Sequence, residues 1–508
     1  MTEIKRVRSA LISVYHKEGI DAWLQELKSR NVTIYSTGGT YDYIRSLGID
    51  AIPVEKVTDY PSIFGGRVKT LHPKIMGGIL FRRDEESDLD EAARYEIPPI
   101  DLVIVDLYPF SETLAITDDS AEIIEKIDIG GISLIRGAAK NFADVAIVPS
   151  SADYALALDW FKEGDGGFTF TQRHYLAARA FAVSSAYDNS IFNYFSSQTG
   201  TPGLRISIDE HITLRYGENP HQKGWFYGNP HAVFEQLHGK EISYNNFLDI
   251  DAALGLIDEF EETTVAIIKH NNACGCASAA TVSEAWEKAL AGDPVSAFGG
   301  VIVSNEMIDE KAAQLINTLF FEIILAPEYE KKALEILKSR KNRIILQLRS
   351  WQPHGQLYRS AAGGLLVQDR DQAEEDISAW ETKTQKAPSA GEIEDLVFAN
   401  RVVKHLKSNA IAIAKNKQLL GAGAGQTSRV DALKHAIAKA QAFGFDLKGA
   451  VLASDAFFPF ADSVQLAHEA GITAIVQPGG SVRDNDSIDY CNQNGIAMIF
   501  TGIRHFKH

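Results

Sequence analysis

Short apolar runs that end abruptly in polar residues constrain the fold of this chain more than any other feature. The clearest run is residues 265–268, which Lys269 and His270 follow at once. Four apolar residues without alternation are typical of a strand that is covered on both faces. Such strands belong to α/β folds, in which ligands bind beyond the carboxyl ends of the strands. We therefore expect an α/β fold with Lys269 and His270 at a ligand site, although a solvated lysine and a capping histidine would give the same pattern.

Length and composition indicate a globular protein of two to four domains. The chain has 508 residues, of which 45% are hydrophobic and 23% are charged. No run of about 18 apolar residues is present, so the sequence predicts no membrane span. The first residues also lack the cleavage pattern of a signal peptide. We therefore expect no contact with membranes.

The charge and the cysteine content indicate where the protein is located and which partners it can bind. The net charge of -17 disfavours nonspecific nucleic-acid binding, so we expect no nucleic-acid partner and local basic clusters for any anionic substrate. Three cysteines are too few for a disulfide framework and fit a reducing cytoplasm.

A glycine-containing turn near the N-terminus is a possible phosphate site. Strands are expected at residues 9–14 and 32–35, with a helix at 20–27 between them, and the second strand leads into Ser36, Thr37, Gly38, Gly39 and Thr40. Backbone N–H groups and hydroxyls in such a turn suit a phosphate. A plain strand–helix connection needs the same residue types, so both interpretations stay open.

The next basic segment lies between two glycine pairs. In the sequence GGRVKTLHP, residues 65–73, an extended backbone would point Arg67 and Lys69 to the same side. Two cations on one side of a strand would form an anion clamp. A buried strand is then expected in residues 101–110, and its far end carries Tyr108.

A helix that begins near Asp128 supplies a further cation. It is expected to run to residue 141, with Arg136 and Lys140 on one face because they are four residues apart. A solvated lysine is the ordinary alternative for Lys140. Three basic segments that each follow a glycine pair favour a shared anion site.

The first domain is expected to close with a long helix. Apolar residues recur at helical spacing through residues 171–195, and residues 196–203, SSQTGTPG, have the composition of a linker. The main domain boundary is therefore placed there.

The second region contains a polar loop, residues 215–222 with the sequence RYGENPHQ, before helices expected at residues 249–259 and from 281. From about residue 409 the chain loosely repeats the order of elements that starts near residue 265. The repeat suggests two related α/β subdomains.

Two familiar motifs are absent. The run of alternating Gly and Ala at residues 421–425 lacks the spacing of a dinucleotide-binding turn. Cys274 and Cys276 have the wrong spacing for a zinc deaminase. We expect no catalytic metal.

Many segments together resemble one known family. They are STGGT, GGRVKTLHP, DLYPF, IDIGG with RGAAKN, LRYGENPHQ, KHNNACG, SNAIAIAKN, GAGAGQTSR, SDAFFPFAD and QPGGSVRD. The chain is similar, over nearly its whole length, to the bifunctional AICAR formyltransferase and IMP cyclohydrolase family. The resemblance implies formyl transfer from the co-substrate 10-formyltetrahydrofolate to AICAR, and then ring closure of formyl-AICAR to IMP. It also implies a homodimer whose transformylase sites are built from both chains.

The resemblance also implies the domain organisation. An N-terminal cyclohydrolase domain of the methylglyoxal synthase-like fold, with a parallel sheet, would span residues 1–198. A linker at 199–206 would lead to the transformylase region, residues 207–508. That region would hold two cytidine deaminase-like α/β subdomains, at about 207–385 and 386–508.

The matched motifs imply the site residues. For the first phosphate site they are Ser13, Lys17, Ser36, Thr37, Gly38, Thr40 and Arg67, and for cyclisation Lys69, Tyr108, Asp128 and Lys140. For formyl transfer they are Lys269 and His270. Around AICAR and folate they are Arg215, Tyr216, Glu322, Asn409, Arg429, Phe457, Asp462, Arg504, Phe506 and His508.

The sequence departs from the family pattern at two places. Tyr15 and His16 stand where a Ser-Asp pair is usual, and Glu322 stands where an Asp can contact AICAR. These departures put individual contacts in doubt rather than the reactions.

Other functions stay open at this point. A noncatalytic purine-nucleotide sensor would keep both pockets, and a chain with one surviving activity would keep one. The set of candidate proton-transfer groups disfavours a sensor. If His270 is not the base of formyl transfer, His221 is the next candidate.

Overall fold

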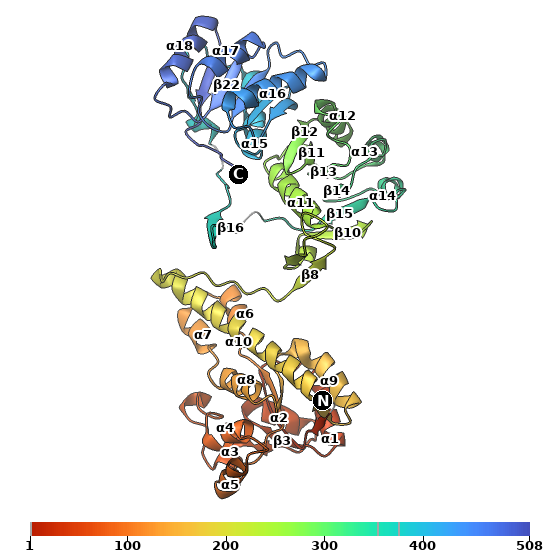
Figure 1. Cartoon of the computed structure of the whole chain (residues 1–508), viewed down its shortest axis with the longest axis vertical. Helices are drawn as coiled ribbons and strands as arrows, with labels where there is room; N and C mark the ends of the chain where they lie inside the picture. Colours follow the sequence, from red (N-terminus) through yellow and green to blue (C-terminus); the bar gives the residue numbers. More distant parts are fainter. Residues whose placement is uncertain (1–2, 353–354, 374–375) are drawn as a thin grey trace. The chain divides into compact units, whose positions relative to one another are not determined.

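The computed structural model describes residues 3–352, 355–373 and 376–508. The chain divides into two compact units, Met1–Asp209 and Glu210–His508 (Figure 1). The boundary expected between the two subdomains stays a prediction.

Unit 1 is built on a parallel five-stranded sheet with the order β4-β3-β2-β5-β6. The strands are β2 (Ser9–Val14), β3 (Thr33–Ser36), β4 (Ile52–Pro53), β5 (Leu102–Asp106) and β6 (Ala146–Val148). The central strands are continuous apolar runs because helices cover both of their faces. The expected parallel-sheet N-terminal domain is thus confirmed.

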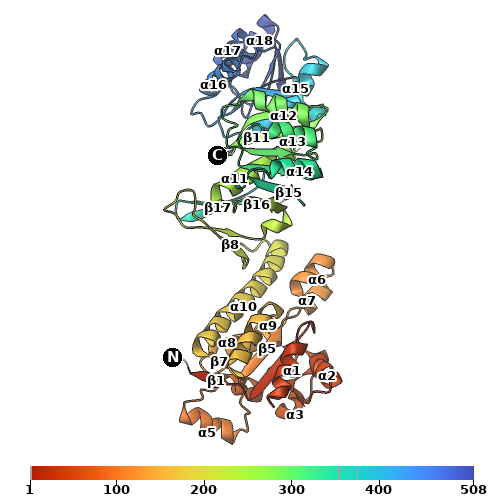
Figure 2. The same cartoon turned by 90° about the vertical axis from the view of Figure 1, so that its right-hand side faces the viewer.

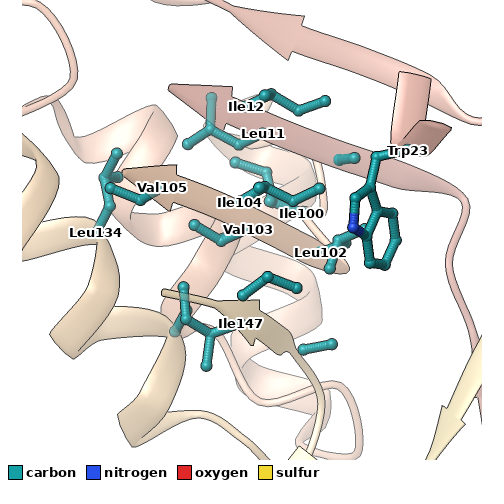
Figure 3. Close-up of a cluster of buried hydrophobic side chains, with 14 of the residues drawn as sticks. Leu11, Ile12, Trp23, Ile100, Leu102, Val103, Ile104, Val105, Leu134 and Ile147 are labelled. Atoms are coloured by element: carbon teal, nitrogen blue, oxygen red, sulfur yellow. The ribbon is translucent and has the colours of Figure 1, made fainter. Parts of the chain in front are cut away.

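Helices and a small ribbon complete unit 1. The helices are α1 (Asp21–Ser29), α2 (Gly38–Ser46), α3 (Val54–Thr58), α4 (Pro73–Leu80), α5 (Glu86–Arg94), α6 (Phe110–Ile116), α7 (Ser120–Glu125), α8 (Gly130–Lys140), α9 (Tyr154–Glu163) and α10 (Phe170–Thr199). Strands β1 (Ile4–Arg6) and β7 (Gly167–Thr169) pair antiparallel. Figure 3 shows apolar side chains of β2, β5 and β6 in one core with Trp23 of α1, which is fully buried. This core fixes the strand ends that carry the site.

The long helix α10 differs from its expected end. Thr169 and Gln172 form a capping box at its start, and the helix continues to Thr199, where Gly200 ends it in the left-handed region at φ 67°. The expectation that residues 196–199 are linker is wrong. Polar residues on an exposed helix face do not reveal that the helix continues.

Unit 2 contains a 12-stranded mixed sheet with the order β10-β15-β14-β13-β11-β12-β20-β19-β21-β22-β23-β18. In chain order the strands are β10 (Phe234–His238), β11 (Thr264–Lys269), β12 (Asn272–Ser278), β13 (Val301–Ser304), β14 (Ile323–Ala326), β15 (Ile344–Leu348), β18 (Glu381–Thr382), β19 (Ile411–Lys415), β20 (Gln418–Gly423), β21 (Val451–Ser454), β22 (Ala474–Gln477) and β23 (Ala497–Phe500). Two separate ribbons pair β8 (His211–Leu214) with β9 (Gly224–Tyr227) and β16 (Gln356–Ala361) with β17 (Gly364–Asp369).

Helices cover the two faces of this sheet differently. Helices α11 (Tyr244–Ile257) and α15 (Ala390–Lys404) share one core, on one face. On the other face, α12 (Val282–Gly292), α13 (Glu310–Ile316) and α14 (Lys331–Leu337) cover one half of the sheet. There α16 (Arg429–Ala442), α17 (Asp462–Glu469) and α18 (Asp484–Asn494) cover the other half (Figures 1 and 2).

The repeat expected from the sequence is present in this topology. A helix, an antiparallel hairpin and three further strands, α11 with β11 to β15, recur as α15 with β19 to β23. The two hairpins meet at β12 and β20, which joins both halves into one sheet. Helix α11 begins earlier than the expected residue 249, because Ser243 and Asn246 form its capping box.

Among the described residues, no helix is both long enough and apolar enough to cross a bilayer.

Candidate functional site

A pocket of about 730 Å³ opens at the carboxyl ends of the strands in unit 1. It is lined by predicted residues from β2, α2, the loop before α4, the end of β5 and the start of α8. They are Ser13, Lys17, Thr37, Thr40, Arg67, Lys69, Tyr108 and Asp128. The structure thus brings these positions, distant in sequence, to one place.

Two helices begin at this pocket. Helix α2 starts at Gly38, with Thr37, Gly39 and Thr40 in the wall, and α8 starts with Gly130 and Gly131 in the wall. The unpaired N–H groups of a helix start attract anions. Gly38 has φ 55°, and a Cβ there would lie 3.2 Å from Lys69 Nζ. A side chain at this position would be strained and would press on that ammonium.

Lys17 lies within hydrogen-bonding distance of the α2 start. Its Nζ donates to the Tyr15 carbonyl (2.9 Å) and to Thr40 Oγ1 (3.4 Å). Burial lowers the pKa of the Lys17 ammonium. Ser36 does not line the pocket: its buried hydroxyl donates to the Ile12 carbonyl at 2.8 Å, which holds β3 against β2.

The segment that carries Arg67 and Lys69 is not extended. Phe64–Gly66 form a 3-10 turn, and Arg67 itself has helical dihedral angles of φ -65° and ψ -24°. The predicted strand is therefore wrong, although both cations still line the pocket. Arg67 pairs with Glu125 at the end of α7. The sequence pattern missed this carboxylate, which a bound anion would have to replace.

Asp128 is a half-buried carboxylate in the wall of the pocket. Its carboxylate accepts the Gly131 N–H (2.6 Å) and the Tyr108 N–H (3.4 Å), while its own N–H donates to Tyr187 Oη (2.9 Å). Burial raises the pKa of the Asp128 carboxyl and also the pKa of the Tyr108 hydroxyl. The raised pKa values mean that both groups hold a proton more readily than usual.

Lys140 is not brought to the pocket. It is exposed at the last residue of α8, whereas the pocket is lined by the first residues of that helix. The unusual Tyr15 does line the pocket, and its ring meets the Tyr108 ring edge-on at 5.6 Å. His16 Nδ1 lies 2.9 Å from Asp106 Oδ2.

In unit 2, Lys269 ends β11. Its Nζ donates to the carbonyls of Phe298 and Gly299, both at 3.0 Å. The Phe298 ring lies 5.0 Å from the Phe320 ring, and 60% of Phe298 and 53% of Phe320 are exposed. Sequence reasoning missed this aromatic pair, for which the SAFGG segment was the available signal.

His270 and Asn271 form the turn between β11 and β12, with φ 50° and φ 63°. The turn is held from α11, where Asp249 Oδ1 accepts the Asn271 N–H at 2.8 Å. Burial raises the pKa of the Asp249 carboxyl, and the charges of His270 and Lys269 offset part of this rise. No sequence pattern singled out Asp249.

Further predicted residues lie near the start of α11. Asn246 Nδ2 donates to Glu322 Oε2 (3.1 Å), and Lys240 Nζ lies 3.5 Å from the same oxygen. Asn245 Nδ2 donates to the Glu218 carbonyl (3.2 Å) in the loop that follows Arg215 and Tyr216. Arg215 and Tyr216 therefore lie on a loop held near Glu322.

A second cluster surrounds Arg429 at the start of α16. Its guanidinium donates to Asn409 Oδ1 (2.9 Å) and Ser454 Oγ (2.7 Å) and pairs with buried Asp455. The C-terminal tail joins this cluster, because Lys507 N–H donates to Ser408 Oγ at 3.1 Å.

The other predicted residues lie nearby in the fold. Arg504 stacks over the Phe506 ring at 4.4 Å, and the Phe506 and His508 rings lie 5.8 Å apart. Phe457 is 37% exposed in the loop before α17, and Asp462 begins that helix. The Lys407 N–H donates to Asn272 Oδ1 at 2.9 Å, which links this half to the His270 turn.

Comparison with known proteins assigns both regions. Residues 138–439 match the family model described as AICARFT/IMPCHase bienzyme, and residues 19–133 match the MGS-like domain. The chain is 59% identical to a bifunctional purine biosynthesis protein PurH of Bacteroides thetaiotaomicron, over all of both chains. It is 47% identical to proteins of the same name from Caldicellulosiruptor saccharolyticus, over 99% of this chain, and Aquifex aeolicus, over 98%, in each case across the full length of the relative.

Proposed function

Since the chain belongs to the AICARFT/IMPCHase bienzyme family, we propose that its two reactions take place at the two sites described above. The protein is an AICAR formyltransferase and an IMP cyclohydrolase of purine biosynthesis. It acts on small molecules and uses a folate one-carbon donor. Which residues carry each reaction is our proposal.

Cyclisation belongs in the pocket of unit 1. The helix starts at Gly38 and Gly130, together with Lys17, provide the positive environment that the phosphate of formyl-AICAR needs. Ser13, Thr37, Thr40 and Arg67 complete the proposed phosphate site, from which Ser36 is left out because its hydroxyl is bound to the Ile12 carbonyl. Arg67 would exchange Glu125 for the phosphate.

Ring closure places negative charge on the former formyl oxygen as the amide nitrogen attacks the formyl carbon. Lys69 is the ammonium in the pocket wall that would stabilise this oxyanion. Tyr108 and Asp128 have raised pKa values and would hold or return the protons that leave as water forms. The single observation that carries this assignment is that these three groups line the same pocket.

The cyclisation assignment is tested with supplied formyl-AICAR. We expect Lys69→Ala to slow IMP formation about a hundredfold or more, because one oxyanion donor is lost, and to leave formyl transfer unchanged. Lys140→Ala is the matched comparison, since Lys140 lies outside the pocket of its own chain. Near-normal cyclisation by Lys140→Ala would remove Lys140 from the mechanism.

Near-normal cyclisation by Lys69→Ala would refute the assignment of Lys69 as the oxyanion donor.

Formyl transfer belongs at the turn after β11. We propose 10-formyltetrahydrofolate as the donor and His270 as the base that removes the proton from the weakly nucleophilic AICAR amine. Lys269, fixed by two carbonyls, would stabilise the oxyanion that develops on the formyl group. The exposed rings of Phe298 and Phe320, tilted by 42° to each other, offer an apolar surface near the Phe298 carbonyl that holds this lysine.

The remaining predicted residues are proposed to bind AICAR and folate around this turn. They are Arg215, Tyr216, Glu322, Asn409, Arg429, Phe457, Asp462, Arg504, Phe506 and His508. The absence of a catalytic metal, the cytoplasmic location and the lack of nucleic-acid and membrane partners stay predictions.

A homodimer is the proposed assembly, with transformylase sites built from both chains. The ribbon of β16 and β17 supports it, because its apolar residues are exposed: Leu357, Tyr358, Leu365, Leu366 and Val367. By the register of the two strands, Tyr358, Leu365 and Val367 lie on one face of the ribbon and Leu357 and Leu366 on the other. A two-stranded ribbon is marginally stable alone, so exposed apolar side chains on both of its faces favour a contact with another chain.

Leu366→Glu tests the assembly, because Leu366 is the most exposed of these side chains at 61%. We expect the variant to sediment as a monomer, to lose formyl transfer and to keep cyclisation. A variant that stays dimeric and active would show that the ribbon is not the contact.

A further inference from the structure

The structure assigns a positioning role to Asp249: its carboxylate holds the turn that carries His270 in the geometry needed for formyl transfer. This inference rests on the proposed role of His270 as the base. Asp249 lies on α11, a separate element from the hairpin that it holds.

The His270 turn places two consecutive residues with side chains in the left-handed region. His270 and Asn271 both have positive φ, at 50° and 63°, and only two residues connect β11 to β12. This left-handed region is unfavourable for a residue with a Cβ, although Asn tolerates it better than most. A histidine held there is the kind of strained residue that clusters at functional sites.

Asp249 supports this turn through two groups of Asn271. Its Oδ1 accepts the Asn271 backbone N–H at 2.8 Å. With the Asn271 amide oriented so that its nitrogen faces these acceptors, it also donates to the same oxygen at 3.0 Å and to the Leu248 carbonyl at 3.1 Å. Asn271 is thus tied to α11, and this contact fixes the backbone of the turn next to His270.

The second half of unit 2 repeats the arrangement. In α15, Asp395 accepts the N–H groups of Asn416 (2.9 Å) and Lys417 (2.7 Å), which form the turn between β19 and β20 with φ 53° each. The same helix position therefore holds a turn of the same shape that lacks a histidine. Asp395 is a natural control for a structural effect without a catalytic one.

The surroundings of Asp249 also connect it with the reacting groups. Its carboxylate interacts with the charges of both His270 and Lys269. Because the imidazole must meet the AICAR amine at bonding distance, a displacement of about 1 Å is worth roughly a hundredfold in rate. Asp249 acts on the reaction through where it holds His270.

The test compares Asp249→Ala, Asp249→Asn and Asp395→Ala in the full-length protein. We expect Asp249→Ala to lower kcat for formyl transfer by roughly ten- to a hundredfold, with KM for AICAR and folate nearly unchanged. Asn keeps the Oδ1 acceptor, so Asp249→Asn should recover most of kcat. Asp395→Ala should leave kcat near wild type. All three variants should cyclise formyl-AICAR normally.

Three outcomes would overturn the inference. They are a normal kcat in Asp249→Ala, no recovery in Asp249→Asn, or an equal loss of kcat in Asp395→Ala. The His270→Ala variant distinguishes a failure of the positioning role of Asp249 from a failure of the proposed site. If His270→Ala retains formyl transfer, the assignment of the base is wrong and Asp249 cannot act through it. If His270→Ala is inactive while Asp249→Ala is normal, only the positioning role fails.

Discussion

The two hairpin turns of unit 2 share one scaffold but differ in chemistry. Each hairpin has a register shift, after Ile267 in β11 and after Ile413 in β19, and each first strand ends in a lysine. The first turn then carries His270 where the second carries Asn416. The fold therefore supplies a position at the strand end, and the residue placed there decides whether a proton can be transferred.

The surroundings of the two lysines differ as well. Lys269 Nζ donates to the backbone carbonyls of Phe298 and Gly299, and Phe298 pairs with the exposed Phe320 ring, whereas Lys415 Nζ donates to the Lys448 carbonyl. A pocket of about 450 Å³ near the second turn contains carboxylates and lysines together. Lys417, in that turn, is paired with Glu262 and Glu394. Its charge is already compensated within the protein.

A large difference is expected between the two lysines. Lys269→Ala should slow formyl transfer about a hundredfold or more, because an oxyanion donor is lost. Lys415→Ala should leave the rate near wild type. Steady-state assays of both variants measure this contrast, and an equal loss in both would show that the two strand ends contribute alike.

A smaller effect, on stability, is expected to be equal in the two halves of unit 2. A Cβ on Gly275 would lie 2.1 Å from the Ala289 carbonyl oxygen, and one on Gly421 would lie 2.3 Å from the Ala436 carbonyl oxygen. Each Gly→Ala substitution should therefore destabilise the protein by about 1–3 kcal/mol through overpacking. Thermal unfolding of unit 2 measures the loss of stability in each variant. A clear loss in one variant only would mean that the two hairpins are not packed equivalently.

The smallest effect is expected when a histidine is placed in the second turn. Asn416→His should change formyl transfer by no more than roughly twofold, as for an ordinary exposed substitution. The lysine beside it, Lys415, donates to the Lys448 carbonyl rather than to the segment that carries Phe298. A marked gain in rate would show that a histidine at the turn is sufficient by itself.

Local sequence patterns predicted much of the fold. The apolar runs at residues 9–14 and 265–268 are strands, because burial on both faces leaves a strong signature. The end of α10 and the shape of the Arg67 segment were not predicted correctly. The helix continues through polar residues, and glycines with positive φ turn residues 64–66 into a helical turn.

The pocket of unit 1 was largely predicted, since its residues sit at strand ends and helix starts that sequence motifs mark. Glu125 and Asp249 were not predicted, because each lies in an ordinary helix. Each also contacts a residue far away in the sequence. Pairings of this kind depend on how helices pack, which spacing along the chain does not encode.

His270→Asn is the most direct test of the central claim, because it gives the first turn the residue found in the second. Asparagine tolerates positive φ better than histidine, so the variant should fold and bind both substrates normally. We predict that kcat for formyl transfer falls roughly a hundred- to ten-thousandfold, the usual contribution of a positioned base, while cyclisation of supplied formyl-AICAR stays at the wild-type rate. Formyl transfer at the wild-type rate in this variant would contradict the account.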